Sequence, residues 1–227
     1  MITGATRLVG LIGNPVEHSL SPAMHNAAFA ARGLDWAYVP LPVEDGSVDD
    51  AVRGLAALGF AGANVTAPHK GAAAAAADTD LDSVNVLVVH DGRVEGLSTD
   101  TAILAGLAAE RPVILGAGGA ASAFRTALPA AAVFSRSGDW PPDTGSADLV
   151  VNATSEREAV LCKLTAGQVL IDLPYPETAT ARAARAAGAT VVTGLEVLVA
   201  QGAAAFEIWT GVQAPVEVMR AAVGLTP

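Results

Sequence analysis

Short apolar runs alternate with longer stretches of helical character along most of the chain. Each run has the length of a buried strand and is bounded by glycine, proline or small polar residues, which are turn signals. Helices separate most of these runs, and such alternation is typical of parallel βαβ units, so the pattern predicts an α/β protein. The predicted strands are residues 8–12, 36–41, 60–65, 84–90, 93–97, 113–115, 131–134, 149–151, 169–173 and 190–192.

The boundaries of the predicted helices rest on local signals. Ser21-Pro22 opens the first helix, with serine as the expected N-cap and proline at the first helical position. Asp91-Gly92 predicts a two-residue hairpin. Residues 136–148 contain two glycines and two prolines, so no crossover helix is expected there. The predicted helices are residues 21–32, 47–58, 71–77, 99–110, 122–128, 179–187, 195–210 and 215–223.

A second unit begins near Pro112. The predicted fold class is α/β: an N-terminal α/β substrate domain plus a Rossmann-like, doubly wound dinucleotide-binding domain. The C-terminal helices are expected to return to the first domain, because chain termini often lie close together. We place the substrate domain at residues 1–101 and 195–227, and the dinucleotide-binding domain at residues 102–194.

A glycine-rich turn follows the first strand of the second unit and opens a helix. In a dinucleotide site such glycines permit a tight turn and the close approach of a pyrophosphate, which then meets the helix N-terminus. Glycine-rich turns also occur in ordinary βα corners, but the strand and helix on either side favour nucleotide binding. The candidate residues are Gly116, Ala117, Gly118, Gly119 and Ala120.

Two further strand ends are candidates for cofactor contacts. Ser135, Arg136 and Ser137 stand where an NAD-binding protein would place an acid, and they suit a ribose 2′-phosphate, so NADP is favoured over NAD. The alternative is a solvated loop arginine. Asn152, Ala153 and Thr154 end another strand, where they would lie beside the cofactor or simply cap a helix.

Composition narrows the classes of partner. A net charge of −10 argues against a nucleic-acid surface and a basic membrane-binding face. No apolar run approaches the roughly 18 residues of a membrane span, and the N-terminus lacks a signal-peptide pattern. The single cysteine, Cys162, excludes an internal disulfide and a cysteine-rich metal site, and no metal site is predicted. We expect a cytoplasmic protein that binds a small molecule, as a monomer or homodimer.

Lys70 is the strongest candidate for chemistry. It lies in the first turn of a predicted helix, where the partial positive charge of the helix N-terminus disfavours a cation. The chain has two lysines against eleven arginines, which suggests a need for an amine that can lose its proton. The alternative is a surface lysine. Asp100 is the acid we expect to pair with it.

Other polar residues lie near the predicted strand ends of the first unit. Hydroxyls and amides gathered at one sheet edge would suit a polyhydroxylated substrate, and the candidates are Asn64, Thr66, Asn85, Ser98, Thr99 and Asp100. Ser19 and Ser21 precede a helix and could bind an anion, although their spacing alone favours an N-cap. His69 is expected to face solvent beside Lys70.

Taken together, these stretches resemble the shikimate dehydrogenase family over nearly the whole chain. The segments that carry the resemblance, in family order, are Gly13-Asn14-Pro15, His18-Ser19-Leu20-Ser21-Pro22, Asn64-Val65-Thr66-Ala67-Pro68-His69-Lys70, Val84-Asn85, Thr99-Asp100, Gly116-Ala117-Gly118-Gly119-Ala120, Ser135-Arg136-Ser137, Asn152-Ala153-Thr154-Ser155 and Gly194 to Ala203.

The resemblance implies NADPH-dependent reduction of 3-dehydroshikimate to shikimate in aromatic amino acid biosynthesis. It implies Lys70 as the acid-base residue with Asp100 as its partner. Asn64, Thr66, Asn85 and Gln201 would line the substrate ring, and Ser19, Ser21 and Tyr175 would hold its carboxylate. Gly116 to Ala120, Arg136, Asn152 to Thr154, Leu173 and Gly194 would hold the cofactor.

The chain also departs from the family pattern. Ser98 replaces asparagine before Thr-Asp, Glu196 replaces glycine, and Glu156-Arg157 follows Ser155 where the family has x-Gly-Met. Two alternatives stay open. One is a paralogue acting on quinate or another polyol acid, or preferring NAD. The other is a non-catalytic nucleotide-sensing module of the same fold.

Overall fold

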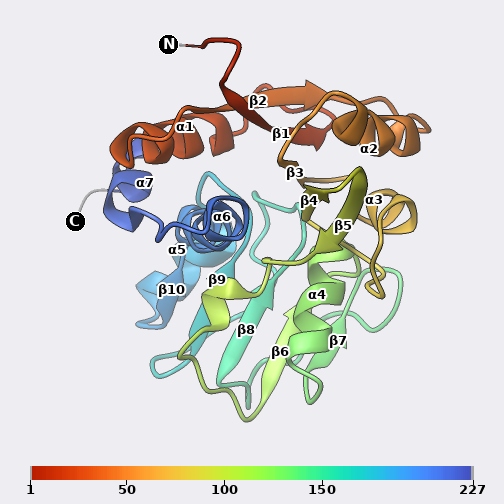
Figure 1. The fold of residues 1–227 in the computed structure, drawn as a ribbon. Helices are drawn as coiled ribbons and strands as arrows, with labels where there is room; N and C mark the ends of the chain where they lie inside the picture. Colours follow the sequence, from red (N-terminus) through yellow and green to blue (C-terminus); the bar gives the residue numbers. More distant parts are fainter. Residues whose placement is uncertain (1, 226–227) are drawn as a thin grey trace. The chain divides into compact units, whose positions relative to one another are not determined.

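The computed structural model describes residues 2–225 and separates into two compact units (Figure 1). Unit 1 combines the N-terminal part of the chain, up to Thr99, with the segment from Val199 onward. Unit 2 runs from Asp100 to Leu198. The chain is α/β throughout, as the sequence predicts, and its C-terminal segment from Val199 onward belongs with the N-terminal unit.

Unit 1 is built on a five-stranded sheet of order β2-β1-β3-β4-β5. The first three strands pair in parallel, and β4 and β5 form the predicted antiparallel hairpin at one edge. The elements of this part are β1 (Arg7–Gly13), α1 (Ser21–Ala31), β2 (Trp36–Pro42), α2 (Val48–Ala57), β3 (Gly62–Val65), α3 (Lys70–Ala76), β4 (Val86–His90) and β5 (Arg93–Leu97).

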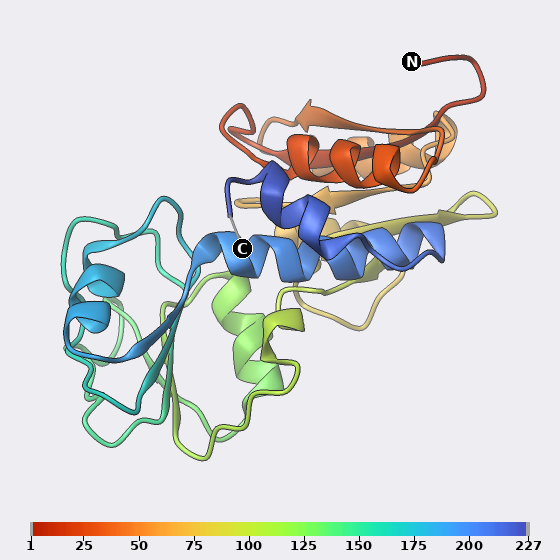
Figure 2. The same cartoon turned by 90° about the vertical axis from the view of Figure 1, so that its left-hand side faces the viewer.

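Helices cover both faces of this sheet. Helices α2 and α3 bury Val52, Leu55 and Ala73 against residues such as Ile12 and Leu87. Helix α1 packs on β2 and beside α7, as Figure 2 shows. The apolar area removed from water on the two faces supplies the main driving force for folding of this unit.

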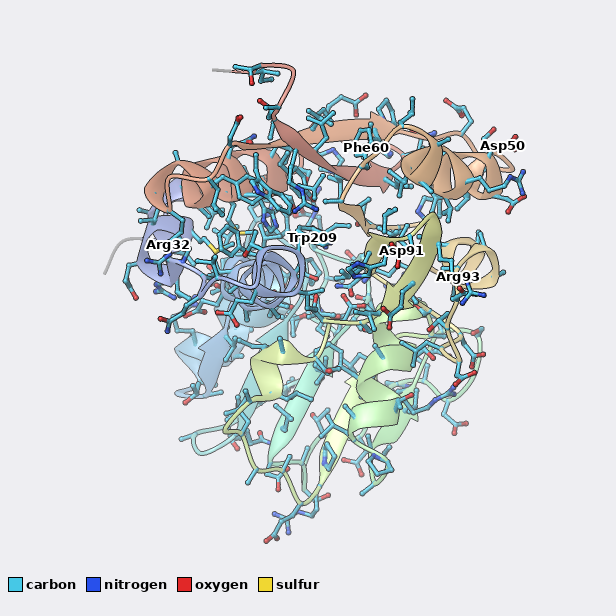
Figure 3. The ribbon with its side chains drawn as sticks, viewed as in Figure 1. Arg32, Asp50, Phe60, Asp91, Arg93 and Trp209 are labelled. Atoms are coloured by element: carbon cyan, nitrogen blue, oxygen red, sulfur yellow. The ribbon has the colours of Figure 1, made fainter. Side chains whose placement is uncertain are left out.

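Helix α6 (Gly194–Thr210) begins in unit 2 and continues into unit 1 from Val199, and α7 (Val216–Ala222) lies in unit 1. Trp209 of α6, labelled in Figure 3, donates its Nε1–H to the Leu87 carbonyl of β4 at 3.0 Å. Gly62 permits this approach, because a Cβ there would lie 2.1 Å from the same carbonyl oxygen and 2.5 Å from Trp209 Nε1. Arg32 also ties α1 to the turn between α6 and α7 through the Gln213 carbonyl at 2.8 Å.

Unit 2 contains an all-parallel sheet of order β10-β9-β8-β6-β7. Strand β6 has β7 on one side and β8 on the other, so the direction of winding reverses between β6 and β8. No helix lies between β7 and β8, as predicted for residues 136–148. The elements are a 3₁₀ turn (Ala102–Leu104), β6 (Pro112–Leu115), α4 (Gly119–Ala127), β7 (Ala132–Phe134), β8 (Leu149–Asn152), β9 (Val169–Asp172), α5 (Ala179–Ala186) and β10 (Thr190–Val192).

Three local predictions were wrong. The helix expected at 99–110 is reduced to the 3₁₀ turn at Ala102–Leu104. Ser21 is not an N-cap: it is the first residue of α1, and its backbone N–H donates to Ser19 Oγ at 3.3 Å. His69 does not face solvent but is buried, with Nε2 2.7 Å from the Val43 carbonyl oxygen.

No helix within residues 2–225 combines the length and the apolar character that a membrane crossing requires.

His25 of α1 is fully buried in an aromatic cluster of unit 1. Its ring stacks on Tyr38, with centroids 4.6 Å apart, and contacts Trp209 at a tilted angle. Neither ring nitrogen has a hydrogen-bond partner among the described residues. Burial lowers the pKa of His25 from 6.5 to about 3, so the folded protein holds this imidazole neutral.

This burial predicts a specific loss of stability in mild acid. The unfolded chain takes up a proton on His25 below pH 6.5 and the folded chain does not, so stability falls as pH drops from 6.5 towards 3. At pH 5 the loss relative to pH 7 is about 2 kcal/mol from this residue. Urea unfolding of the His25→Phe variant should show a pH dependence shallower by that amount.

The exposed His90 provides the matched control, since His90→Gln should retain the wild-type pH dependence. Parallel pH profiles for wild type and His25→Phe would contradict the assignment, whatever their absolute stabilities.

Candidate active site

Asn85 lies at the centre of a polar network in unit 1. Its side chain is 2% exposed, and its Nδ2 donates to Thr99 Oγ1 and Gln201 Oε1, both at 3.1 Å. Its Oδ1 accepts from the Thr99 N–H at 2.7 Å. A buried amide must find partners for its donors and acceptor. This one therefore joins the start of β4, the residues after β5 and helix α6.

The network continues to β3 and β2 through Asn64. Asn64 Nδ2 donates to the Asn85 carbonyl at 3.0 Å, and its Oδ1 accepts from the Tyr38 hydroxyl at 2.8 Å. Tyr38 is in turn stacked on His25. The structure thus brings together three residues predicted for the substrate ring, Asn64, Asn85 and Gln201. Tyr38, whose hydroxyl holds the Asn64 amide in place, carries no sequence motif and was missed.

Lys70 is the first residue of α3, on a turn fixed at several points. The Thr66 N–H donates to the Ile12 carbonyl at 2.9 Å, which holds the start of the turn against β1. Buried His69 holds its end against the Val43 carbonyl. The Lys70 carbonyl accepts from the Val84 N–H at 3.2 Å, so the lysine backbone lies one residue from Asn85. The predicted acid-base residue is therefore held beside the amide network by rigid backbone.

The serine pair lies at the entrance to α1. Ser19 Oγ accepts from the Ser21 N–H, and the Ser21 side chain is buried. Helix α6 packs closely here, since a Cβ on Gly202 would lie 2.2 Å from Met24 Cε. Met24 is one turn from Ser21, and Gly202 is adjacent to Gln201. The α1–α6 packing thus brings the serine pair and Gln201 to the same part of unit 1.

The predicted glycine turn of unit 2 lies at the point where the strand order reverses. Gly116 has φ +119°, and a Cβ there would lie 2.9 Å from the Ala153 carbonyl oxygen, which follows β8. Gly118 is the N-cap of α4 and supplies no side-chain cap, and a Cβ there would meet nothing within 4 Å. The turn thus leaves open space at uncapped helix N–H groups, which fits a dinucleotide pyrophosphate.

The end of β8 is fixed by a buried pair of side chains. Asn152 Nδ2 donates to Asp172 Oδ1 at 2.7 Å, and both residues are buried at the carboxyl ends of neighbouring strands. Asn152 Oδ1 accepts from the Thr154 N–H at 3.1 Å and from its hydroxyl at 2.8 Å. Burial raises the pKa of Asp172, while bonds from Asn152 and Thr178 oppose that rise. Asp172 orients the Asn152–Thr154 loop, and sequence reasoning missed it.

Gly194 lies against the loop that carries Leu173. A Cβ at Gly194 would lie 2.5 Å from the carbonyl oxygens of both Leu173 and Pro174, so only glycine fits. Glu196 follows, and its Oε2 accepts from the Thr193 N–H at 2.7 Å, while Thr193 Oγ1 accepts from the Glu196 N–H at 3.4 Å. This is a capping box at the start of α6. The Thr-x-x-Glu spacing could have revealed it.

Arg136 follows β7, as predicted, and is already paired within unit 2. Its guanidinium donates to Glu156 Oε2 at 3.0 Å, from the loop after β8. Ser135 and Ser137 share a hydrogen bond between their hydroxyls at 3.2 Å. Backbone N–H groups of Ala159 and Glu158, with Arg136, lower the pKa of the Glu156 carboxyl. Glu156 is thus a carboxylate at neutral pH.

Asp100 and Tyr175 belong to unit 2. The pairing of Asp100 with Lys70 and the contact of Tyr175 with the substrate carboxylate stay predictions. Residues 2–225 contain no cluster of His, Cys, Asp and Glu that could hold a metal ion.

The sequence of the chain is similar to those of proteins of known function. The family model described as "Shikimate dehydrogenase substrate binding domain" matches residues 11–86, and "Shikimate 5'-dehydrogenase C-terminal domain" matches residues 194–223. A relative named "Shikimate dehydrogenase (NADP(+))" from Anaeromyxobacter dehalogenans is 42% identical and aligns over 95% of each chain.

Solved structures show the same similarity. The Thermus thermophilus shikimate 5-dehydrogenase in complex with NADP(H) and shikimate has a TM-score of 0.84 and 30% identity, over 96% of this chain and 98% of that one. The Corynebacterium glutamicum quinate dehydrogenase in complex with NAD has a TM-score of 0.80 and 26% identity, over 96% and 98% of the chains. With more than 40% identity to a curated relative over nearly its full length, the chain belongs to the shikimate dehydrogenase family.

Proposed function

We propose that the chain is an NADP-dependent oxidoreductase that reduces 3-dehydroshikimate to shikimate, reversibly, in the shikimate pathway of aromatic amino acid and chorismate biosynthesis. The observation that carries the proposal is the amide network of Asn64, Asn85 and Gln201 beside the turn that bears Lys70. We expect the enzyme to act in the cytoplasm on a small molecule, as a monomer or homodimer.

The amide network suits a ring that carries several hydroxyl groups. Each amide offers both a donor and an acceptor, as a hydroxyl does, and the network holds the amides in fixed orientations. Asn64, Thr66, Asn85 and Gln201 would bind the ring. The hydroxyls of Ser19, Ser21 and Tyr175 would bind the substrate carboxylate. The overall negative charge of the protein makes such local donors necessary for an anionic substrate.

Lys70 supplies the proton in this proposal. When bound, NADPH supplies a hydride to the ketone carbon of the substrate. The ketone oxygen then gains electron density, and the Lys70 ammonium donates a proton to it from Nζ, which yields the hydroxyl. In the reverse direction the neutral amine removes that proton. Asp100 would hold the amine and share the proton at the substrate hydroxyl.

The cofactor would lie over the carboxyl edge of the sheet in unit 2. Open space at Gly118 and the close approach of Gly116 to the β8 loop fit a pyrophosphate at the reversal of strand order. Arg136 provides the cation for a 2′-phosphate. The residues proposed to hold NADP are Gly116, Ala117, Gly118, Gly119, Ala120, Ser135, Arg136, Ser137, Asn152, Ala153, Thr154, Leu173 and Gly194.

A quinate-type or NAD-preferring enzyme is the second candidate. It is favoured by the pairing of Arg136 with Glu156, which occupies the cation expected to recognise NADP. The third, a nucleotide-sensing module without catalysis, is disfavoured because the chain retains Lys70 and Asp100, which a sensor would not need.

The direct test is an assay of the reverse reaction. Purified protein mixed with shikimate and NADP should produce reduced cofactor, followed by its absorbance. Quinate with NADP, and both polyol acids with NAD, identify the preferred pair. The absence of turnover in all four combinations would exclude the enzyme.

Lys70→Ala should lower kcat by about 100-fold or more, because general acid-base catalysis contributes that much or more. Shikimate binding, measured by calorimetry, should change little. Lys163→Ala is the matched control, since Lys163 is exposed and is the other lysine of the chain. Equal rates for Lys70→Ala and wild type would remove Lys70 from its proposed role.

Gly118→Ala should separate folding from cofactor binding. The backbone at Gly118 is extended and a Cβ would meet nothing within 4 Å, so the melting temperature should stay near that of wild type. The added methyl group would occupy the space proposed for the pyrophosphate, so the dissociation constant for NADP should rise by about tenfold or more. Unchanged NADP affinity would place the cofactor elsewhere.

A further inference from the structure

The ion pair between Arg136 and Glu156 joins the two loops that flank the glycine turn. Arg136 follows β7 and Glu156 follows β8, while β6, which leads into Gly116, lies between those strands. Both residues belong to unit 2. The pair therefore lies at the carboxyl edge where the adenosine half of a dinucleotide would bind, on either side of the strand that leads to its pyrophosphate site.

The carboxylate is the better anchored member of the pair. Glu156 Oε1 accepts from the Glu158 N–H at 3.0 Å and from the Ala159 N–H at 3.2 Å. The Glu156 N–H donates to Thr154 Oγ1 at 3.3 Å, and Thr154 is itself held by Asn152. The Arg136 side chain is 65% exposed and that of Glu156 is 26% exposed. A ligand can move the arginine more easily than the glutamate.

Building on the proposed function, we propose that Glu156 is a specificity-determining residue: it occupies Arg136 and weakens recognition of a ribose 2′-phosphate, so the site discriminates little between phosphorylated and unphosphorylated adenine dinucleotides.

The reason is electrostatic competition at one guanidinium. A 2′-phosphate brings between one and two negative charges near neutral pH. To pair with Arg136 it must draw the guanidinium away from Glu156, or lie close to a carboxylate held by two backbone N–H groups. Each route raises the free energy of the complex. A ribose with a free 2′-hydroxyl meets neither obstacle, and its hydroxyl can donate to a carboxylate.

The test uses two nucleotide fragments and the full chain. Calorimetry gives the dissociation constants of adenosine 2′,5′-bisphosphate and of AMP, which differ by the 2′-phosphate. For Glu156→Gln we expect the bisphosphate to bind roughly three- to tenfold more tightly, the range of an exposed ion pair plus one removed repulsion. AMP should bind within about twofold of wild type. Glutamine keeps Oε1 as an acceptor for the two N–H groups, so the loop is preserved.

Two controls isolate the ion pair. Glu158→Gln removes the same charge from the same loop at an exposed side chain and should leave both affinities near wild type. Arg136→Gln should weaken bisphosphate binding, and adding Glu156→Gln to it should then have a smaller effect than in wild type, because only the repulsion between the carboxylate and the phosphate is removed. In turnover assays, Glu156→Gln should raise the ratio of kcat/KM for NADP to that for NAD by the same factor as the fragments show.

The opposite outcomes overturn the inference. Weaker bisphosphate binding by Glu156→Gln would mean that Glu156 orients Arg136 for the phosphate. Equal changes for AMP and bisphosphate, or no change, would mean that Glu156 has no part in specificity. The fragment measurements need no turnover, so they stand even if the shikimate assay fails.

Discussion

The buried amide of Asn85 is the interaction on which the candidate substrate site depends. Its donors and its acceptor are all engaged, by Thr99 after β5 and by Gln201 of α6. Leaving a buried amide group without a partner costs roughly 1–3 kcal/mol, so the network holds these segments together. Asn85 and Gln201 lie 116 positions apart in sequence, so their bond ties helix α6 to the N-terminal part of unit 1.

The same amide connects the proposed substrate-binding residues to the turn that carries Lys70. Val84, the residue before Asn85, donates its N–H to the Lys70 carbonyl. Asn64, at the end of β3, bonds to the Asn85 carbonyl and lies six residues before Lys70. A catalytic group must be held to a fraction of an ångström to be effective. Here the backbone of the lysine turn and the amides that would grip the substrate share one set of hydrogen bonds.

Much of the fold could be predicted from the sequence because strand length, helix spacing and turn residues are local signals. The strands, the hairpin at Asp91-Gly92 and the missing crossover helix after Arg136 were all predicted in this way. The helix predicted at residues 99–110 was wrong. The segment has a helical composition, but Thr99 is bonded to Asn85 and the chain forms only a 3₁₀ turn. Tertiary contacts overrode propensity there.

Side-chain partners were harder to predict than positions. Strand ends predicted Asn64 and Asn85 for a candidate site and family resemblance added Gln201, but nothing in the sequence pointed to Tyr38 or Asp172. These two act by fixing a neighbour, and that role depends on which strands lie side by side. His69 was placed in solvent because a histidine beside a loop is usually exposed, whereas the loop after β2 folds over it.

The departures from the family pattern have unequal consequences. Glu196 closes a capping box with Thr193, so its carboxylate is satisfied within its own helix turn and stabilises the start of α6. Glu156 is satisfied in part by its own loop and in part by Arg136, a residue with a proposed role in cofactor recognition. A substitution whose new side chain finds all its hydrogen-bond partners within its own turn changes stability alone. One whose partner belongs to a proposed binding site would also change what that site selects, as we propose for Glu156 through its pairing with Arg136.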